Sequence, residues 1–268
     1  MSYFLTKHLK TNDISIPTDY ALWSHLHDAI YTYPVQVYAR GKLQGKYYLC
    51  DANNLYLAVA KDTKLPGTIA TSIILPTAQQ VINLVRKYIC IAFCYVRKCQ
   101  YPFVYSSTEE QKTNPPDKAW LWLSAKELEI ALDYNCLEQV IVIYAFRQSQ
   151  SLPEYAADCL EKLCELKRTH DKLFYRGLKH ILLAALGKFA TRGYRTIPMP
   201  NYPALSWYGF TPPPTKSKSG FFYAYAFGHT YKIEWGFPTS ISAPQIFACI
   251  TANSRVHMFQ LLSGVDKS

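Results

Sequence analysis

Residues 153–191 read PEYAADCLEKLCELKRTHDKLFYRGLKHILLAALGKFAT. The first part, Pro153–Arg168, begins at a proline, which suits the first position of a helix. The second part, Lys172–Thr191, has apolar residues at every third or fourth position, the spacing of one helix face. The apolar faces comprise Tyr155, Cys159, Leu163 and Leu166 in the first helix and Phe174, Leu178, Ile181, Ala185 and Phe189 in the second. Because only residues 169–171 separate the helices, we expect an antiparallel helical hairpin.

A row of cations follows the second helix. Lys172, Arg176 and Lys179 are spaced to share one helix face, opposite much of the predicted apolar stripe. Lys167 and Arg168 add charge at the tip of the hairpin. Cations in this arrangement can bind a phosphate chain. A solvated basic face explains the same spacing, so the residues alone leave both interpretations open.

The rest of the chain alternates between strand-like and helical patterns. Two Ser/Thr-x-x-Glu/Gln sequences, Thr77–Gln80 and Ser124–Glu127, predict capping boxes that begin helices ending near Lys87 and Asp133. A third helix is expected from about Pro244 to Leu262. The predicted strands are Tyr88–Val96, Ala119–Leu123, Val140–Phe146, Phe221–Phe227 and Thr230–Trp235. This order favours an α+β fold with an antiparallel sheet and packed helices over a doubly wound sheet.

The composition indicates a folded chain with a polyanionic partner. Of the 268 residues, 49% are hydrophobic, and the formal net charge is +10. The apolar fraction excludes a disordered chain. The longest uncharged apolar run is far shorter than the roughly 20 residues of a membrane helix, and no secretory signal is visible. The charge excess favours a polyanion without identifying it.

The eight cysteines do not form a metal-binding or disulfide pattern. None shows Cys-x-x-Cys spacing, and Cys90, Cys94 and Cys99 lie in or beside an apolar run with no histidine nearby. We therefore expect buried free thiols. His25 and His27 have strand-like spacing and are expected on the surface or at a hinge.

Asp51 follows the short apolar run Tyr47–Cys50 and precedes Tyr56 by five residues. A carboxylate at the end of a strand can hold a divalent cation. An aspartate that caps a turn fits the same local sequence, so this residue alone does not decide between the two.

Two stretches resemble motifs of family-B DNA polymerases. Residues 48–57, YLCDANNLYL, resemble motif A, D-x-x-S-L-Y-P, and residues 179–189, KHILLAALGKF, resemble motif B, K-x-x-x-N-S-x-Y-G-K-F. Residues 121–129, LWLSAKELE, and 250–255, ITANSR, are similar to segments of the protein-primed branch, which serves phages, adenoviruses and linear plasmids. The four stretches occur in the family's order.

The resemblance implies a role for each matching residue. Asp51 corresponds to one of two carboxylates that bind the two catalytic Mg²⁺ ions, and Tyr56 to the residue that stacks under the sugar and excludes a 2′-hydroxyl. Lys179 neutralises the incoming triphosphate, with Arg168 and Lys172 beside it, and Gly187 lets the helix pass close to the new base pair. The reaction is in-line attack of a 3′-hydroxyl on an α-phosphate. The partners implied are DNA, deoxynucleotides and a terminal-protein primer.

This sequence also departs from the family pattern. Asn54 and Leu57 replace the serine and proline of motif A, while Leu183, Ala184 and Leu186 replace polar residues of motif B. Motif C, Y-x-D-T-D-S, with the second metal carboxylate, is not found, and Asp266 is a poor substitute. We therefore expect little or no polymerase activity from this chain alone. Two explanations stay open: a truncated or split gene product, with motif C and the thumb on a second polypeptide, or a decayed relative that keeps its affinity for DNA.

Two other functions are compatible with the sequence. A nucleic-acid-binding protein without catalysis uses the basic hairpin and the 22 Tyr, 13 Phe and 5 Trp to bind backbone and bases. A basic structural protein predicts no DNA affinity at low salt. The expected division is a lead-in and palm part over residues 1–150, the fingers hairpin over 151–196 and a palm continuation over 197–268. The expected location is intracellular, in viral, plasmid or organellar replication.

Overall fold

The computed structural model describes residues 13–30, 54–104, 117–169, 172–200, 220–226, 228–239 and 242–263. The helices are α2 (Tyr20–Asp28), α3 (Leu55–Asp62), α4 (Ala78–Lys87), α5 (Lys126–Asp133), α6 (Ser151–Arg168), α7 (Lys172–Lys188) and α8 (Pro244–Ser263). The strands are β1 (Pro66–Ile74), β2 (Ile89–Arg97), β3 (Lys118–Ser124), β4 (Leu137–Gln148), β5 (Gly193–Pro198), β6 (Gly220–Ala226) and β7 (His229–Phe237). The predicted α+β fold with antiparallel sheets is confirmed.

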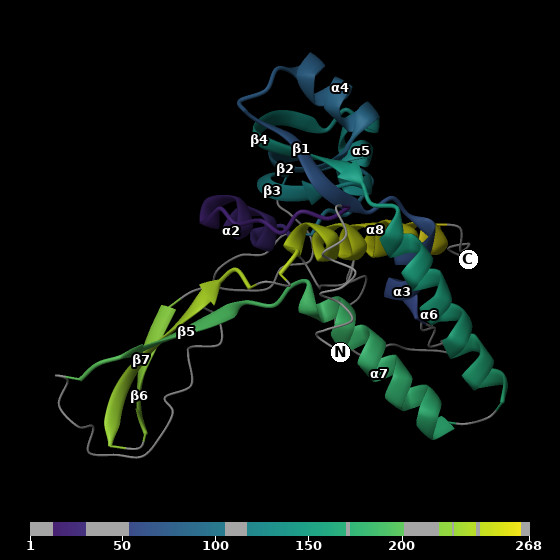
Figure 1. Ribbon diagram of the computed structural model, residues 1–268. Helices are drawn as coiled ribbons and strands as arrows, with labels where there is room; N and C mark the ends of the chain where they lie inside the picture. The colour runs from purple at the N-terminus through teal and green to yellow at the C-terminus, as the bar shows by residue number, and fades with distance from the viewer. Residues whose placement is uncertain are drawn as a thin grey trace, which may run out of the picture.

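A four-stranded sheet in the order β1-β4-β2-β3 forms the upper part of the molecule in Figure 1. All its neighbouring strands are antiparallel. Alternate residues of the central strands face opposite sides, and both sides are buried. Helices α4 and α5 cover one side, where Cys94, Leu121 and Leu128 belong to one core cluster. The Thr77–Gln80 capping box that begins α4 is present as predicted.

Helix α8 lies against the other side of this sheet and connects it to the rest of the molecule (Figure 1). Nearly every residue from Ala243 to Val256 is buried, so the helix is enclosed on all sides. The buried hydroxyls of Thr251 and Ser254 donate to backbone carbonyls within the helix, at 3.0 and 2.7 Å. These bonds satisfy the two polar groups inside an apolar core.

Helices α6 and α7 form the predicted hairpin, which extends from α8 on the side opposite the sheet (Figure 1). The predicted apolar stripe of α7 is wrong in part. Phe174 and Ile181 are 67% and 46% exposed, whereas Phe189 is buried as predicted. Leu182 and Leu186, which were not part of the predicted stripe, are also buried. The buried side of α7 is thus rotated about the helix axis from the predicted side. Helix α7 contacts the other elements mainly along its second half.

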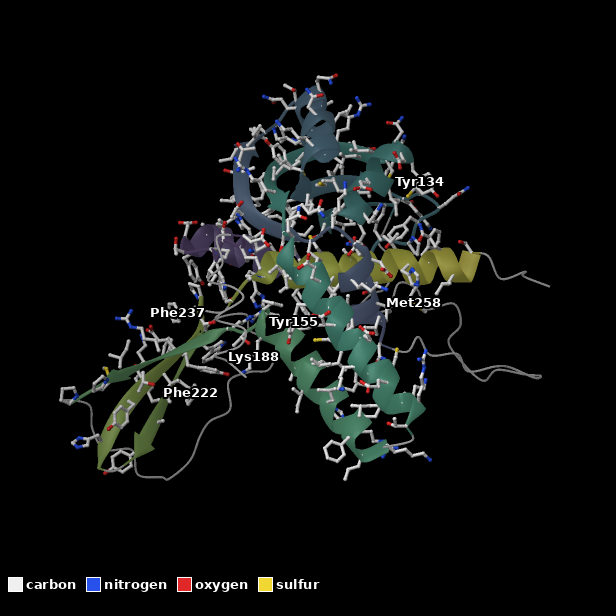
Figure 2. The ribbon with its side chains drawn as sticks, turned by 45° about the vertical axis from the view of Figure 1, so that its right-hand side comes forward. Tyr134, Tyr155, Lys188, Phe222, Phe237 and Met258 are labelled. Carbon is white, nitrogen blue, oxygen red and sulfur yellow. The ribbon has the colours of Figure 1, made fainter. Side chains whose placement is uncertain are left out.

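A three-stranded sheet, β5-β7-β6, extends from the molecule in a second direction (Figure 1). At its base, the ring of Phe237 lies 6.3 Å from that of Tyr20 on α2 (Figure 2). The predicted strands β6 and β7 are confirmed, but β5 follows α7 where no strand was predicted. Three further elements, α2, α3 and β1, were also not predicted.

The cysteines of the described residues are free thiols, and Cys90, Cys94, Cys136 and Cys249 are buried, as predicted. The predicted burial is wrong for Cys164, which is exposed, whereas Cys99 and Cys159 are half-buried. Burial raises the pKa of the Cys90 thiol to about 12, so it stays protonated at neutral pH. No helix in the described part of the chain is both long and apolar enough to cross a membrane.

Candidate nucleic-acid interface

The motif A stretch continues into helix α3. Asp51 lies outside the described residues, so its predicted metal-binding role stays a prediction. Asn54 is the N-cap residue of α3 in the left-handed conformation, with φ 55°, and Leu57 lies on the buried side of the helix. The ring of Tyr56 lies 6.4 Å from that of Phe247 on α8. The described end of motif A is therefore held by packing on α8.

The cation face of α7 borders the buried face of that helix. Lys172 and Arg176 are exposed, whereas Lys179 is half-buried, next to the packed residue Leu178. In contrast to the prediction, the cations do not lie opposite the side that packs. Phosphate groups bound at Lys179 would therefore lie close to the body of the molecule, and those bound at Lys172 near the hairpin tip.

Gly187 lies half-buried near the end of α7. A Cβ atom built on Gly187 would meet no atom within 4 Å, apart from its own helix and chain neighbours. Packing among the described residues therefore does not require a glycine here. The open space is compatible with the predicted close approach of a ligand.

One core cluster positions two of the predicted nucleotide residues. Tyr56 of α3 and Leu178 of α7 both pack against it, and Leu178 is adjacent to Lys179. Arg168, at the end of α6, and Lys172, at the start of α7, are both exposed at the hairpin tip. The fold thus brings Arg168 and Lys172 to the tip and places Lys179 farther along α7.

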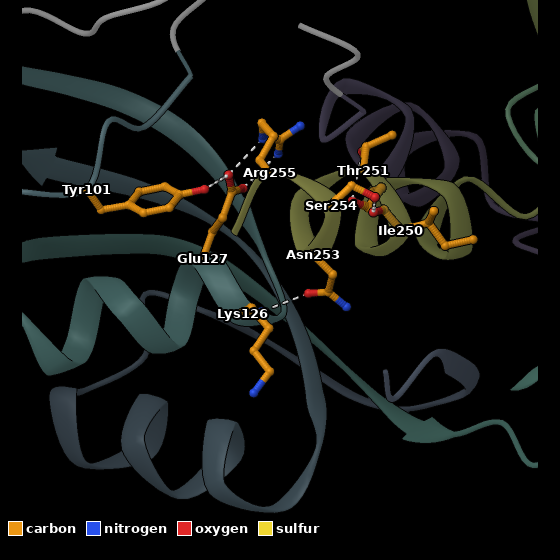
Figure 3. A network of polar contacts seen from close by, with 9 residues as sticks. Tyr101, Lys126, Glu127, Ile250, Thr251, Asn253, Ser254 and Arg255 are labelled. Atoms are coloured by element: carbon orange, nitrogen blue, oxygen red, sulfur yellow. Dashed lines mark hydrogen bonds and ion pairs between the residues drawn. The ribbon is translucent and has the colours of Figure 1, made fainter. Parts of the chain in front are cut away.

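A buried ion pair was not predicted (Figure 3). The Arg255 guanidinium donates to both oxygens of Glu127, at 2.8 Å each, and the Tyr101 hydroxyl donates to Glu127 Oε1 at 3.0 Å. The side chains of Arg255 and Glu127 are only 5% and 2% exposed. The pair fastens α5 to α8, and it gives a structural role to the ITANSR stretch, whose last residue is Arg255.

The predicted capping box Ser124–Glu127 is wrong. Ala125, with φ 47°, is the N-cap of α5 and provides no side-chain hydrogen bond. Glu127 turns inward to Arg255, and Ser124 Oγ is buried without a hydrogen-bond partner among the described residues. The pairing of two buried charges outweighs a surface cap, because a buried arginine without a partner is strongly unfavourable.

The predicted strand-like spacing of His25 and His27 is also wrong. Both lie on α2, and their rings face inward. His25 Nδ1 lies 2.7 Å from the Tyr144 hydroxyl, and His27 Nε2 lies 2.9 Å from the Ala190 carbonyl oxygen, just after α7. Burial, and secondarily Arg192, lowers the pKa of His27. These contacts join α2 to the sheet and to the base of the hairpin.

The described residues contain no group of three or more His, Cys, Asp or Glu side chains arranged to hold a metal ion. The Mg²⁺ ions implied by the resemblance depend on Asp51, which lies outside this part of the chain.

The fold is similar to that of solved DNA polymerase structures. No protein-family model and no curated protein sequence matches the chain. Phi29 DNA polymerase complexed with primer-template DNA matches with a TM-score of 0.55 at 16% identity, over 97% of this chain and 42% of that one. The ternary complex of Phi29 DNA polymerase with primer-template DNA and incoming nucleotide substrates gives 0.57 at 17% identity, over 97% and 43%. The complex with single-stranded DNA gives 0.52 at 17% identity, over 95% and 42%.

These similarities show a DNA polymerase-like fold. The chain spans about two fifths of the length of the polymerases it matches.

Proposed function

We propose that this chain is part of a protein-primed family-B DNA polymerase and that it binds DNA and deoxynucleoside triphosphates along α7. The observation that carries the proposal is the polymerase-like fold over 97% of the chain, which contains a helical hairpin with a cationic face. The motif A and B resemblances, found independently in the sequence, support the same assignment.

Each residue of the site has a proposed task. Lys179 neutralises the triphosphate, and its half-buried position strengthens this interaction because water screens it less. Arg168 and Lys172 bind phosphates at the hairpin tip. Tyr56 packs under the sugar, and Gly187 leaves space for the base pair. Asp51 is the proposed ligand for Mg²⁺, which neutralises the phosphates when bound.

Other features of this assignment are also proposals. The terminal-protein primer, a second polypeptide with motif C and a replication context follow from the resemblance alone. The division at residues 150 and 196 is likewise a prediction. The α6–α7 hairpin occupies Ser151–Lys188, and residue 196 lies within β5.

A second candidate function is nucleic-acid binding without catalysis. Leu186, which replaces a polar residue of motif B, is buried in the core and therefore offers no contact to a nucleotide. Leu183 is half-buried and also apolar. This loss of polar groups favours a protein that keeps its affinity for the DNA backbone but not for a nucleotide.

Binding of a deoxynucleoside triphosphate distinguishes the two functions. We expect the protein with a primer–template oligonucleotide to bind dATP, and Lys179→Ala to weaken this binding at least ten-fold, since it removes a charge-assisted contact. Lys98→Ala is the control, because Lys98 is an exposed cation outside the hairpin. Equal dATP affinity of the two variants would exclude the proposed role of Lys179 and favour the second function.

A further inference from the structure

A pocket of about 360 Å³ lies where six elements of the fold meet. Its lining comes from the end of α3, the end of α4, the start of β2, the start of α5, the end of β4, and α8. Helix α7 contributes no residue to it. The lining thus comes from several elements and from the residues that connect them, with Lys64 in the connection between α3 and β1, rather than from one loop.

The pocket has an excess of positive charge. Its cations are Lys64, Arg86, Lys87 and Lys126, and its carboxylates are Asp62 and Glu129. Both carboxylates already have a cation: Asp62 lies 3.9 Å from Lys61, and Glu129 lies 3.4 Å from Lys126. By contrast, the side chains of Lys64 and Arg86 have no ion pair or hydrogen bond within the described part of the chain. Two cations are thus available to a ligand.

Neutral hydrogen-bond donors accompany these cations. Asn253 is only 4% exposed, and its Oδ1 accepts the backbone N–H of Lys126 at 3.4 Å. Its amide nitrogen and the Lys126 ammonium lie on the side away from the Glu127–Arg255 pair (Figure 3). The Asn253 amide oxygen thus caps the first N–H of α5, and the carboxylates of Glu127 and Glu129 lie in the first turn of that helix.

We propose that this pocket binds a diphosphate or triphosphate group, either free or at the end of a nucleotide. Phosphate oxygens accept hydrogen bonds from both ammonium and amide groups, and Arg86 can donate two at once. The volume is near the lower end of the range of small-molecule pockets, roughly 300–1,000 Å³, so a phosphate chain fits and a DNA duplex does not. This site is separate from the proposed α7 site and does not depend on it.

Calorimetric titration of the full chain with pyrophosphate at constant ionic strength tests this proposal. We expect saturable binding that weakens at least ten-fold in the double variant Lys64→Gln/Arg86→Gln. The matched double variant Lys98→Gln/Lys118→Gln removes the same charge outside the pocket and should bind like the unmodified protein. Thermal melting of both variants checks that they fold.

Titration with dATP in the Lys179→Ala protein distinguishes the two sources of phosphate. Binding of dATP that requires Lys64 and Arg86 supports a nucleotide ligand, and binding of pyrophosphate alone supports a free diphosphate. The proposal is overturned if pyrophosphate does not saturate, if sulfate binds equally tightly, or if the two double variants bind alike. The pyrophosphate titrations are also carried out in the Lys179→Ala background, so that the α7 site does not contribute; dATP binding that is weakened by Lys179→Ala but not by Lys64→Gln/Arg86→Gln tests the α7 proposal separately.

Discussion

Glu127 shows how one buried carboxylate can hold a junction between elements. It accepts hydrogen bonds from Arg255 and Tyr101, which come from α8 and from the segment after β2. Burial and the neighbouring Glu127 charge raise the pKa of the Tyr101 phenol, so it remains a donor at any physiological pH. The two charges of the group are therefore paired with each other inside the core.

Replacing Glu127 by glutamine should destabilise the protein by about 3–5 kcal/mol, because Arg255 would keep its charge inside the core without a partner. The control is Glu129→Gln, since Glu129 is exposed and its ion pair with Lys126 should contribute less than about 1 kcal/mol. Urea denaturation measures both. Equal free energies of unfolding for the two variants would contradict this account.

His27 makes the stability of the protein sensitive to acid. Its Nε2 lies 2.9 Å from the Ala190 carbonyl oxygen and donates to it, while nitrogens of the Arg192 guanidinium lie 3.2 Å from both ring nitrogens, which disfavours a charged ring. Its pKa in the folded protein is lowered from 6.5, chiefly by burial and then by Arg192, although the hydrogen bond to the Ala190 carbonyl and, to a smaller extent, Asp28 oppose this shift. As the pH falls, the His27 ring of the unfolded chain therefore binds a proton at a higher pH than the His27 ring of the folded protein.

The free energy of unfolding should accordingly be fully retained above about pH 6.5 and decrease as the pH falls toward the folded-state pKa. The decrease due to one proton is at most about 1.4 kcal/mol per pH unit. In His27→Gln, which cannot titrate, the slope between pH 7 and pH 5 should be smaller. Urea denaturation at several pH values gives the slope, and an unchanged slope would show that His27 does not cause it.

At the scale of the elements, local sequence patterns predicted the helices and strands whose burial follows from their own composition. The continuous apolar run of β2 and the capping box of α4 are such cases. Strand β1 was missed because it has an exposed, mixed composition and is held by its pairing with β4. The buried side of α7 depends on where the helix contacts the rest of the molecule. The spacing of the apolar residues within α7 does not contain this information.

Only part of the candidate site could be predicted, because local sequence patterns do not contain contacts between distant elements. The cations of α7 are visible as a helical spacing, and their positions on that helix agree with it. The pairing of Glu127 with Arg255 joins residues 128 positions apart, so no local pattern contains it. A buried pair of this kind competes with the surface cap that the sequence alone suggests.

The corrected α7 face can be tested with two neighbouring residues. Leu182→Ala should lower the free energy of unfolding by about 2–5 kcal/mol, because it leaves a cavity at a site only 7% exposed. Ile181→Ala should change it by no more than about 0.5 kcal/mol, since that side chain is 46% exposed. Thermal or urea denaturation separates the two, and a larger decrease for Ile181 would restore the originally predicted stripe.

At the scale of the whole molecule, α8 connects three parts. The four-stranded sheet lies against one side of it, α3 and the hairpin lie toward the other, and α2 closes its N-terminal end (Figure 1). The net charge of +10 favours a polyanion, and the cations of α7 are exposed or half-buried next to this core. DNA affinity should therefore depend on α7 and not on charge in general.

The most direct test is fluorescence anisotropy of a labelled primer–template oligonucleotide over a range of salt concentrations. The slope of log affinity against log salt should decrease by about 0.9 for each phosphate that the protein no longer neutralises, and thus by nearly 2 in Arg176→Ala/Lys179→Ala. The control Lys98→Ala/Lys118→Ala removes the same charge elsewhere and should retain the unmodified slope. Equal slopes and affinities for the two double variants would contradict the assignment of α7 as the DNA-binding surface.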